Sequence, residues 1–309
     1  MNTRFAIFTM ILSCNCIYGC EAQTTFGNKY LNLEKSIVMP NVKGRIDHLD
    51  VNLKDQLVYV AALGNNTLEV ADLRSGKIMH SISGLDEPQG VGYIPQYNEI
   101  FVANAGNGDC YFYNAKSFEK TATIHLSSDA DDVRYDSVDK KIYVGYGEGG
   151  IAVIDAETHK QIADITLPAH PESFQIDKKM GLLFVNVPKS NIVGVIDLKQ
   201  AKLLNKWQRD SPSANFPMAI DTNNARVFVG YRHAPRLIVY DAKTGSEVSS
   251  NEMTGDADDL YYDQKTKEII ISGGDGYISI FKQQDSNTYG QIANISTSKG
   301  ARTSLLIPS

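Results

Sequence analysis

The chain has little cysteine, a single tryptophan and no long apolar run beyond its beginning. Only four of its 309 residues are cysteine, and three of these fall within the first 20 residues. Cys110 is therefore the one cysteine in the body of the chain, and no internal disulfide is expected there. We expect Cys110 to act as a small apolar side chain within a strand. After residue 30, no segment approaches the ~20 apolar residues of a membrane-spanning helix.

Excess basic charge and the familiar catalytic motifs are also missing. Lys and Arg number 30 against 36 Asp and Glu, which gives a net charge of −6. This balance argues against a nucleic-acid binder, because phosphates require clustered basic side chains. The sequence contains no HExxH, CxxC, GxSxG or phosphate-binding glycine loop, and no CxxCH for covalent haem. No motif therefore assigns a reaction or a cofactor.

Residues 1–22 have the composition of a signal peptide. Arg4 gives a weakly basic start, Phe5 to Leu12 (FAIFTMIL) form a short apolar core, and small residues follow. In IYGC, Cys20 stands where a bacterial lipobox carries its lipid, so lipid attachment to Cys20 is predicted. Cleavage after Ala22 is the alternative. We expect an exported periplasmic or cell-envelope protein that reaches the membrane only through a lipid anchor.

The rest of the chain repeats with a period near 42 residues. The stretch DADD occurs at Asp129–Asp132 and again at Asp256–Asp259, three periods apart. One aromatic or apolar residue marks the same strand-like run in every unit. These landmark residues are Tyr59, Phe101, Tyr143, Phe184, Phe228 and Ile270. Their steps are 42, 42, 41, 44 and 42 residues, and we expect them to pack between neighbouring units.

Each unit contains four strand-like runs separated by tight turns. In the first unit the runs are HLDVN, LVYVAAL, LEVADL and KIMHSIS, with GNNT and RSG among the turns. Alternating β-branched and aromatic residues favour strands, and Gly and Asn favour hairpin turns. Four antiparallel strands every ~42 residues are the unit of a β-propeller blade. The sequence thus predicts an all-β protein with a single β-propeller domain over residues 23–309.

The stretch LVYVAALGNNTLEVADLRSGKIMHSI resembles the repeat of the YVTN-type β-propeller proteins, the YncE-like family. Later units such as KIYVGYGEGGIAVIDAETHK are poorer copies, and the resemblance extends from about residue 40 to 309. It implies a propeller with a WD-like repeat, in which seven blades are usual. It says little about function, because the family includes many unrelated roles.

Closure of the ring depends on the two ends of the repeat region. The chain has six full units, and GARTSLLIPS (residues 300–309) matches the innermost strand of a seventh. Tyr30–Pro40 could supply the outermost strand of the same blade. We therefore expect a seven-bladed ring whose closing blade is incomplete, with a six-bladed ring as the alternative. Unpaired strand edges in such a blade would be open to a partner chain.

One end of the central channel is the expected location of a site. The positions 12 and 11 residues before each landmark are equivalent in every unit, and several of them carry acids or histidine. The candidates for ligand binding there are His48, Asp131, Asp132, His170, Glu172, Asp258, Asp259 and Arg302.

Three interpretations of these residues stay open. An Asp at the start of a strand can accept hydrogen bonds from loop N–H groups and join neighbouring blades. Carboxylates also suit Ca²⁺ or Mg²⁺. The candidate ligands are then Asp132 and Glu172 beside His170, or Asp259 beside Arg302 and His48 on the far side of the ring. Either histidine paired with an Asp could instead serve acid–base catalysis.

The function expected from these features is binding rather than catalysis. We predict a monomeric envelope scaffold whose ligand is an envelope protein, a peptide or a small molecule. The resemblance suggests two alternatives. One is a hydrolase like the propeller lactonases, in which a divalent ion at the channel activates water. The other is an accessory protein of a periplasmic redox system.

Overall fold

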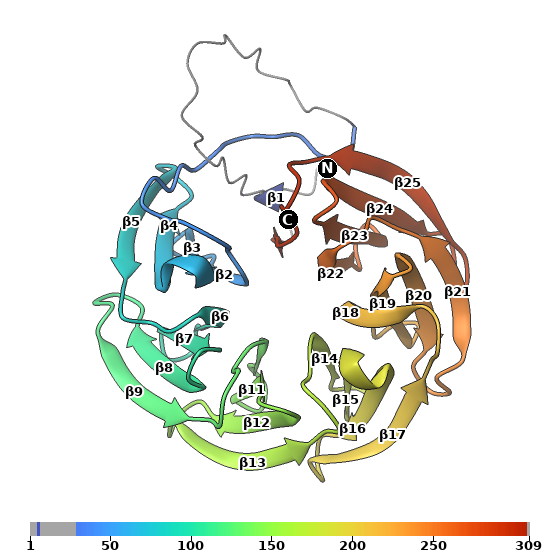
Figure 1. Cartoon of the computed structure of the whole chain (residues 1–309), viewed down its shortest axis with the longest axis horizontal. Helices are drawn as coiled ribbons and strands as arrows, with labels where there is room; N and C mark the ends of the chain where they lie inside the picture. The colour runs from blue at the N-terminus through green and yellow to red at the C-terminus, as the bar shows by residue number, and fades with distance from the viewer. Residues whose placement is uncertain (1–4, 7–28, 308–309) are drawn as a thin grey trace.

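Strands rich in Val, Ile, Tyr and Phe build a ring of sheets around a central channel (Figure 1). The computed structural model describes residues 5–6 and 29–307. Six four-stranded antiparallel sheets follow one another along the chain, and in each sheet consecutive strands are neighbours. The predicted all-β propeller with four-stranded antiparallel blades is therefore confirmed.

The strands of the first three blades are β2 (Leu49–Asn52), β3 (Leu57–Ala62), β4 (Thr67–Asp72), β5 (Lys77–Ile82), β6 (Pro88–Ile94), β7 (Glu99–Asn104), β8 (Asp109–Asn114), β9 (Lys120–His125), β10 (Val133–Asp136), β11 (Lys141–Tyr146), β12 (Gly150–Asp155) and β13 (Lys160–Thr166). Those of the last three are β14 (Phe174–Asp177), β15 (Leu182–Val187), β16 (Ile192–Asp197), β17 (Lys202–Gln208), β18 (Ser213–Asp221), β19 (Arg226–His233), β20 (Arg236–Asp241), β21 (Glu247–Glu252), β22 (Ala257–Asp263), β23 (Glu268–Gly273), β24 (Tyr277–Gln283) and β25 (Tyr289–Ser296). The first strand of each blade lies innermost and the fourth lies at the periphery (Figure 1).

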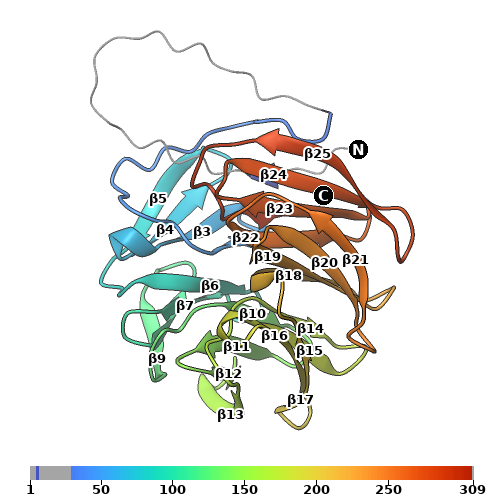
Figure 2. The same ribbon diagram turned by 45° about the vertical axis from the view of Figure 1, so that its right-hand side comes forward.

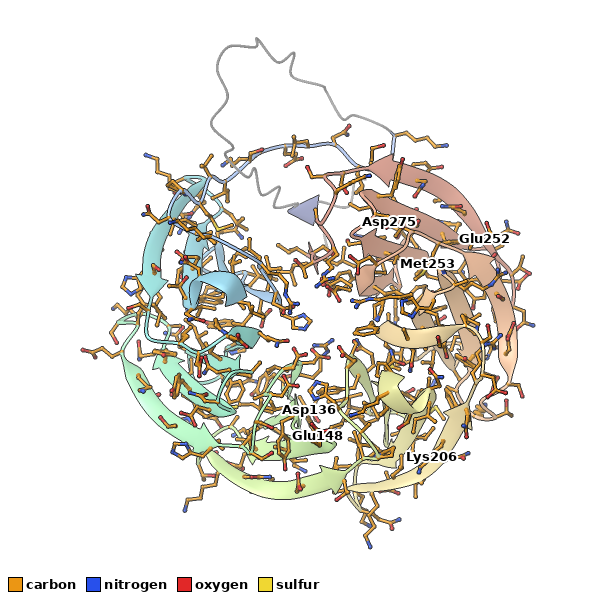
Figure 3. All side chains as sticks on the ribbon, in the orientation of Figure 1. Asp136, Glu148, Lys206, Glu252, Met253 and Asp275 are labelled. Carbon is orange, nitrogen blue, oxygen red and sulfur yellow. The ribbon has the colours of Figure 1, made fainter. Side chains whose placement is uncertain are left out.

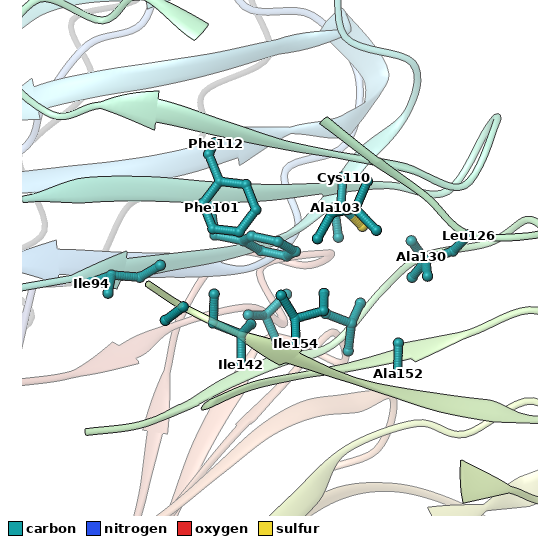
Figure 4. Close-up of a cluster of buried hydrophobic side chains, with 14 residues drawn as sticks. Ile94, Phe101, Ala103, Cys110, Phe112, Leu126, Ala130, Ile142, Ala152 and Ile154 are labelled. Carbon is teal, nitrogen blue, oxygen red and sulfur yellow. The ribbon is translucent and has the colours of Figure 1, made fainter. Parts of the chain in front are cut away.

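The hydrophobic core lies between the blades. In Figure 4, Phe101 and Phe112 of the second blade face Ile142 and Ile154 of the third, and all four side chains are buried. Similar clusters join the other consecutive blades. Because a single four-stranded sheet cannot bury both of its faces, this stacking is what makes each blade stable.

The repeat landmarks occupy this core, as predicted. Tyr59, Phe101, Phe184 and Phe228 have no exposed surface, and Tyr143 and Ile270 are 2% exposed. Cys110 is also fully buried, in β8, and carries a free thiol. Burial raises the pKa of that thiol, so it behaves as the small apolar side chain expected from the sequence.

The closing blade differs from the prediction. The described residues form six complete blades, so the expectation of seven is wrong and the six-bladed alternative holds. In the remaining space between the sixth blade and the first lies a two-stranded sheet (Figure 1). It pairs β1 (Phe5–Ala6) with β26 (Leu305–Leu306) in antiparallel register.

The predicted outermost strand, Tyr30–Pro40, is not a strand and contains only an isolated bridge at Asn32. A strand needs a neighbour to accept and donate its backbone hydrogen bonds, and the described residues provide no middle strands there. The segment instead crosses the outer edge from β25 to the first blade (Figures 1 and 2). Leu31 packs against the sixth blade and Ile37 against the first.

The predicted leader lies almost wholly outside the described residues. Only Phe5 and Ala6 of residues 1–22 are described, so Cys20 and the cleavage point after Ala22 receive no structural account. Within the described part of the chain, no helix has the length and apolar character needed to cross a membrane.

Candidate functional site

The starts of the innermost strands meet around a polar cavity at one end of the channel. Its volume is about 130 Å³, and all six blades and the segment before β26 contribute to it. We call this cavity the channel mouth. Six of the eight candidate residues line it: His48, Asp131, Asp132, Glu172, Asp258 and Arg302. The equivalent repeat positions therefore do lie around one cavity, and their role in ligand binding stays a prediction.

The other two candidates lie beside the channel mouth, and two arginines complete its lining. His170 contacts the mouth through Asp131, whereas Asp259 is buried behind it. Arg45 and Arg232 line the cavity but were not among the candidates. The sequence offers a weak signal for Arg45, because Gly44 aligns with Gly300 and Arg45 then lies one position before the equivalent of Arg302.

Asp131 lies between two imidazoles. His48 Nε2 is 3.4 Å from Asp131 Oδ1, and His170 Nε2 is 4.0 Å from Oδ2. The other nitrogen of His170 lies 2.7 Å from the Gly147 carbonyl oxygen, to which it donates, and 3.4 Å from Asp129 Oδ2. Both rings are thus held in fixed orientations against carboxylates.

These contacts favour the charged form of all three groups. Burial opposes protonation of the histidines, but the contacts with Asp131 and the negative charges of the other nearby carboxylates together outweigh it. They raise the pKa of His48 well above its ordinary value and that of His170 to about 9. Burial also opposes the charge on Asp131, but the adjacent imidazoles of His170 and His48 together lower the pKa of this carboxyl. At neutral pH the group is a carboxylate between two imidazolium ions.

An arginine–aspartate network occupies the opposite side of the channel mouth. Arg232 pairs with Asp258 and stacks on Phe216, with its guanidinium carbon 3.5 Å from the ring centre. Arg302 Nε lies 2.5 Å from Asp258 Oδ2, and Arg302 Nη1 lies 3.0 Å from Asp256 Oδ1. Burial and the neighbouring Arg302 lower the pKa of Arg232 to about 10. The network joins the fifth blade, the sixth blade and the closing segment.

Asp132 and Asp259 join neighbouring blades. Asp132 pairs with Arg134 and accepts a hydrogen bond of 3.2 Å from the backbone N–H of Phe174, in the next blade. Asp259 accepts one of 2.6 Å from the N–H of Ser304, just before β26. The structural interpretation of an Asp at a strand start therefore fits both. Burial raises the pKa of Asp259 to about 6.

The expected groupings around these two residues do not form. Asp132 turns to Arg134 instead of to His170 and Glu172, because adjacent residues of an extended chain point in opposite directions. The ion pairs of Arg302 are to Asp258 and Asp256, and none to Asp259 is found among the described residues. In the described residues, no ion pair or hydrogen bond therefore joins Asp132 to His170 or Glu172, or Asp259 to Arg302 or His48.

Glu172 is the exception among the charged residues of the channel mouth. It lines the cavity and is partly buried. Among the described residues, none forms a hydrogen bond or ion pair with its carboxyl group. Burial and the nearby Asp131 raise the pKa of Glu172 to about 8.

A divalent ion would need several oxygen ligands converging on one point. Within residues 5–6 and 29–307, no group of three or more His, Cys, Asp or Glu side chains is arranged to hold a metal ion. The Ca²⁺ or Mg²⁺ site stays a prediction from the sequence.

The fold and the channel mouth define the class: a six-bladed β-propeller with a charged cavity at one end of its channel. Among solved structures, the chain is similar to Kuenenia stuttgartiensis hydrazine synthase. The TM-score is 0.71 at 13% sequence identity, over 80% of this chain and 85% of that chain. At this identity the likeness shows the fold alone. No family model and no curated protein matches the chain, so membership of the YVTN-type family stays a prediction.

Proposed function

We propose that the chain is a non-catalytic binding propeller whose channel mouth takes a small polar ligand. The observation that carries this proposal is that residues far apart in sequence, from every blade, converge on one cavity of about 130 Å³. A cavity of this size suits a small headgroup better than a folded partner. Its polar groups are held by ion pairs and by the rigid sheets, an arrangement that favours recognition.

The cellular setting is part of the proposal and depends on the leader. Residues 1–22 support export to the periplasm or cell envelope, and IYGC supports a lipid anchor at Cys20. The protein would then act as a monomer facing the periplasm. Membrane fractionation of the whole chain against a Cys20→Ala variant tests this part.

A matched pair of blocking variants tests the binding site. Ser173 lines the channel mouth, and Ser117 lies exposed in the turn before β9. We expect at least one compound in a panel of small amines, carboxylates, sugars, Ca²⁺ and Mg²⁺ to raise the melting temperature of the wild type. Ser117→Phe should respond equally, and Ser173→Phe should not respond, because its ring fills the cavity.

Two results would contradict the proposal. An equal response of Ser173→Phe would place the ligand elsewhere, and a panel without any response would remove the small-ligand site. Hydrolysis of lactones by the wild type, lost in Ser173→Phe, would support the lactonase-like alternative. The His48–Asp131 pair is the observation that favours that alternative. The redox accessory role has only the fold likeness behind it.

A further inference from the structure

Among the charged side chains that line the channel mouth, every one has an ion-pair partner in the described part of the chain except a single carboxyl group. The pairs are Arg45–Asp47, His48–Asp131, Arg134–Asp132, His170–Asp129, Arg232–Asp258 and Arg302–Asp256. The leftover group is Glu172. Its pKa of about 8 leaves Glu172 protonated at neutral pH when the cavity is empty, and once ionised it gives the cavity lining a negative charge that no direct ion pair in the described residues balances.

The charged groups near Glu172 act on it from a distance and do not form a direct ion pair with it. Asp131 repels its negative charge, whereas His170, Arg232 and His48 attract it from a distance. Each of these three cations is already engaged by a carboxylate of its own. A buried carboxylate without a direct partner is costly, so a cation in the cavity would have a favourable place beside Glu172.

We infer that the channel mouth binds a small ligand carrying one positive charge as a primary ammonium group, with Glu172 as its counter-ion. This inference rests on the proposed binding function and names its ligand class. An ammonium group has three N–H donors and no acceptor. The Glu172 carboxylate can accept one, and the Asp131 carboxylate and the Ser173 hydroxyl line the same cavity.

A monovalent ammonium fits better than the other charge classes. A divalent metal ion needs more free oxygen ligands, and Asp131 and Asp132 are already held by His48 and Arg134. An anion would find every cation of the six pairs already neutralised. A single positive charge beside Glu172 stabilises its ionised form and so lowers its pKa from about 8.

Titration calorimetry of the full chain with ethanolamine tests the inference, with acetate, K⁺ and Ca²⁺ as comparison probes. We expect ethanolamine to bind the wild type and to bind Glu172→Gln at least tenfold more weakly. The control is Glu148→Gln. Glu148 lies in the β11–β12 hairpin, nearer the channel than Lys206 or Glu252 (Figure 3), but its side chain is 93% exposed. This variant should bind as the wild type does.

A second measurement tests whether the Glu172→Gln variant is folded. Binding should shift the imidazole NMR signals of His48 and His170 in the wild type, and the free Glu172→Gln variant should show both signals in folded positions. Equal ethanolamine affinity in Glu172→Gln, or no ethanolamine binding, would overturn the inference. If acetate or Ca²⁺ then binds in a way that Ser173→Phe abolishes, the proposed binding function survives. If no probe binds, both fail.

Discussion

Glu172 is partly buried and, unlike the other carboxyl groups that line the channel mouth, has no ion-pair partner among the described residues. Its pKa is raised from the ordinary value of 4.5 to about 8, chiefly by burial and then by Asp131. A group whose pKa is raised by folding favours the folded state fully below its ordinary pKa. That contribution is lost as the pH rises through the folded value. Glu172 should therefore weaken the fold progressively between about pH 4.5 and pH 8.

The variant Glu172→Gln removes this pH-dependent cost. We expect equal stability of wild type and variant at pH 4. At pH 9 the variant should be more stable by roughly 1–2 kcal/mol, since one pKa unit corresponds to about 1.4 kcal/mol and the side chain is only partly buried. Urea unfolding at both values measures the difference, with Glu148→Gln as the exposed control. A difference that does not change with pH would show that Glu172 is not buried in its charged form.

Single residues also mark the limit of sequence-based prediction at the channel mouth. Asp131 and Asp132 are adjacent and stand 12 and 11 residues before the landmark Tyr143. The period therefore places both at the start of the third blade. It does not assign their partners, because these depend on the direction of each side chain. Asp131 turns to His48 and His170, and Asp132 turns to Arg134.

At the scale of the strands, the hairpin between the first two strands of each blade repeats one backbone conformation. One residue in each hairpin has a positive φ of 52° to 68°. These residues are Gln56, Asn98, Lys140, Gly181, Ala225 and Lys267. Their spacing follows the period of the repeat, yet only one of them is glycine. Residues with a Cβ pay roughly 1–2 kcal/mol for this conformation, so five hairpins retain a local strain.

A reciprocal pair of substitutions tests this strain. Lys267 is exposed, with φ 54°, and Lys267→Gly should raise stability by about 0.5–1 kcal/mol in chemical unfolding. Gly181 has φ 68° and open space where a Cβ would stand. Gly181→Ala should therefore cost about 1 kcal/mol through the backbone alone.

The control for these hairpins is Lys54→Gly, in the first blade. Lys54 is exposed in the same kind of turn, and its φ is not positive. Glycine there should give no gain, because it only adds freedom to the unfolded chain. Equal gains at Lys54 and Lys267 would contradict the argument from φ.

The strands themselves could be predicted because alternation and turn residues are local signals. Tyr30–Pro40 shows where such signals fail. Its apolar residues resemble a strand, but strand formation depends on a hydrogen-bonded neighbour that can lie far away in the sequence. Packing of Leu31 and Ile37 across two blades is a tertiary feature, and no local pattern identifies it.

For the whole molecule, the six repeat units read from the sequence correspond to six blades, but the predicted seventh blade at the closure is wrong. A repeat pattern describes contacts between consecutive blades, whereas closure depends on two surfaces at opposite ends of the chain. Counted over the described residues, the clusters between consecutive blades hold ten to fourteen buried residues each. The two clusters flanking the closing position hold five and four. Among the described residues, closure is therefore the interface with the fewest buried apolar side chains.

The short strand β26 bridges this interface. Leu305 packs against the cluster of the first blade and Leu306 against that of the sixth. The N–H of Ser304 donates to Asp259, as that of Phe174 does to Asp132 between the third and fourth blades. The closing segment thus begins as the innermost strand of a further blade would.

Replacing both leucines by serine should open the ring at this point. Each side chain is only partly buried, so we expect the double variant to lose roughly 2–4 kcal/mol of stability, toward the lower end of core truncations. Val138→Ser, at a site 77% exposed, is the control and should change stability by less than about 0.5 kcal/mol. Hydrogen exchange gives the sharper measurement. Because blades contact only their neighbours, protection should fall first in the blades that flank the closure, the first and the sixth, and last in the third and fourth. A uniform loss of protection around the ring would mean that β26 does not close it.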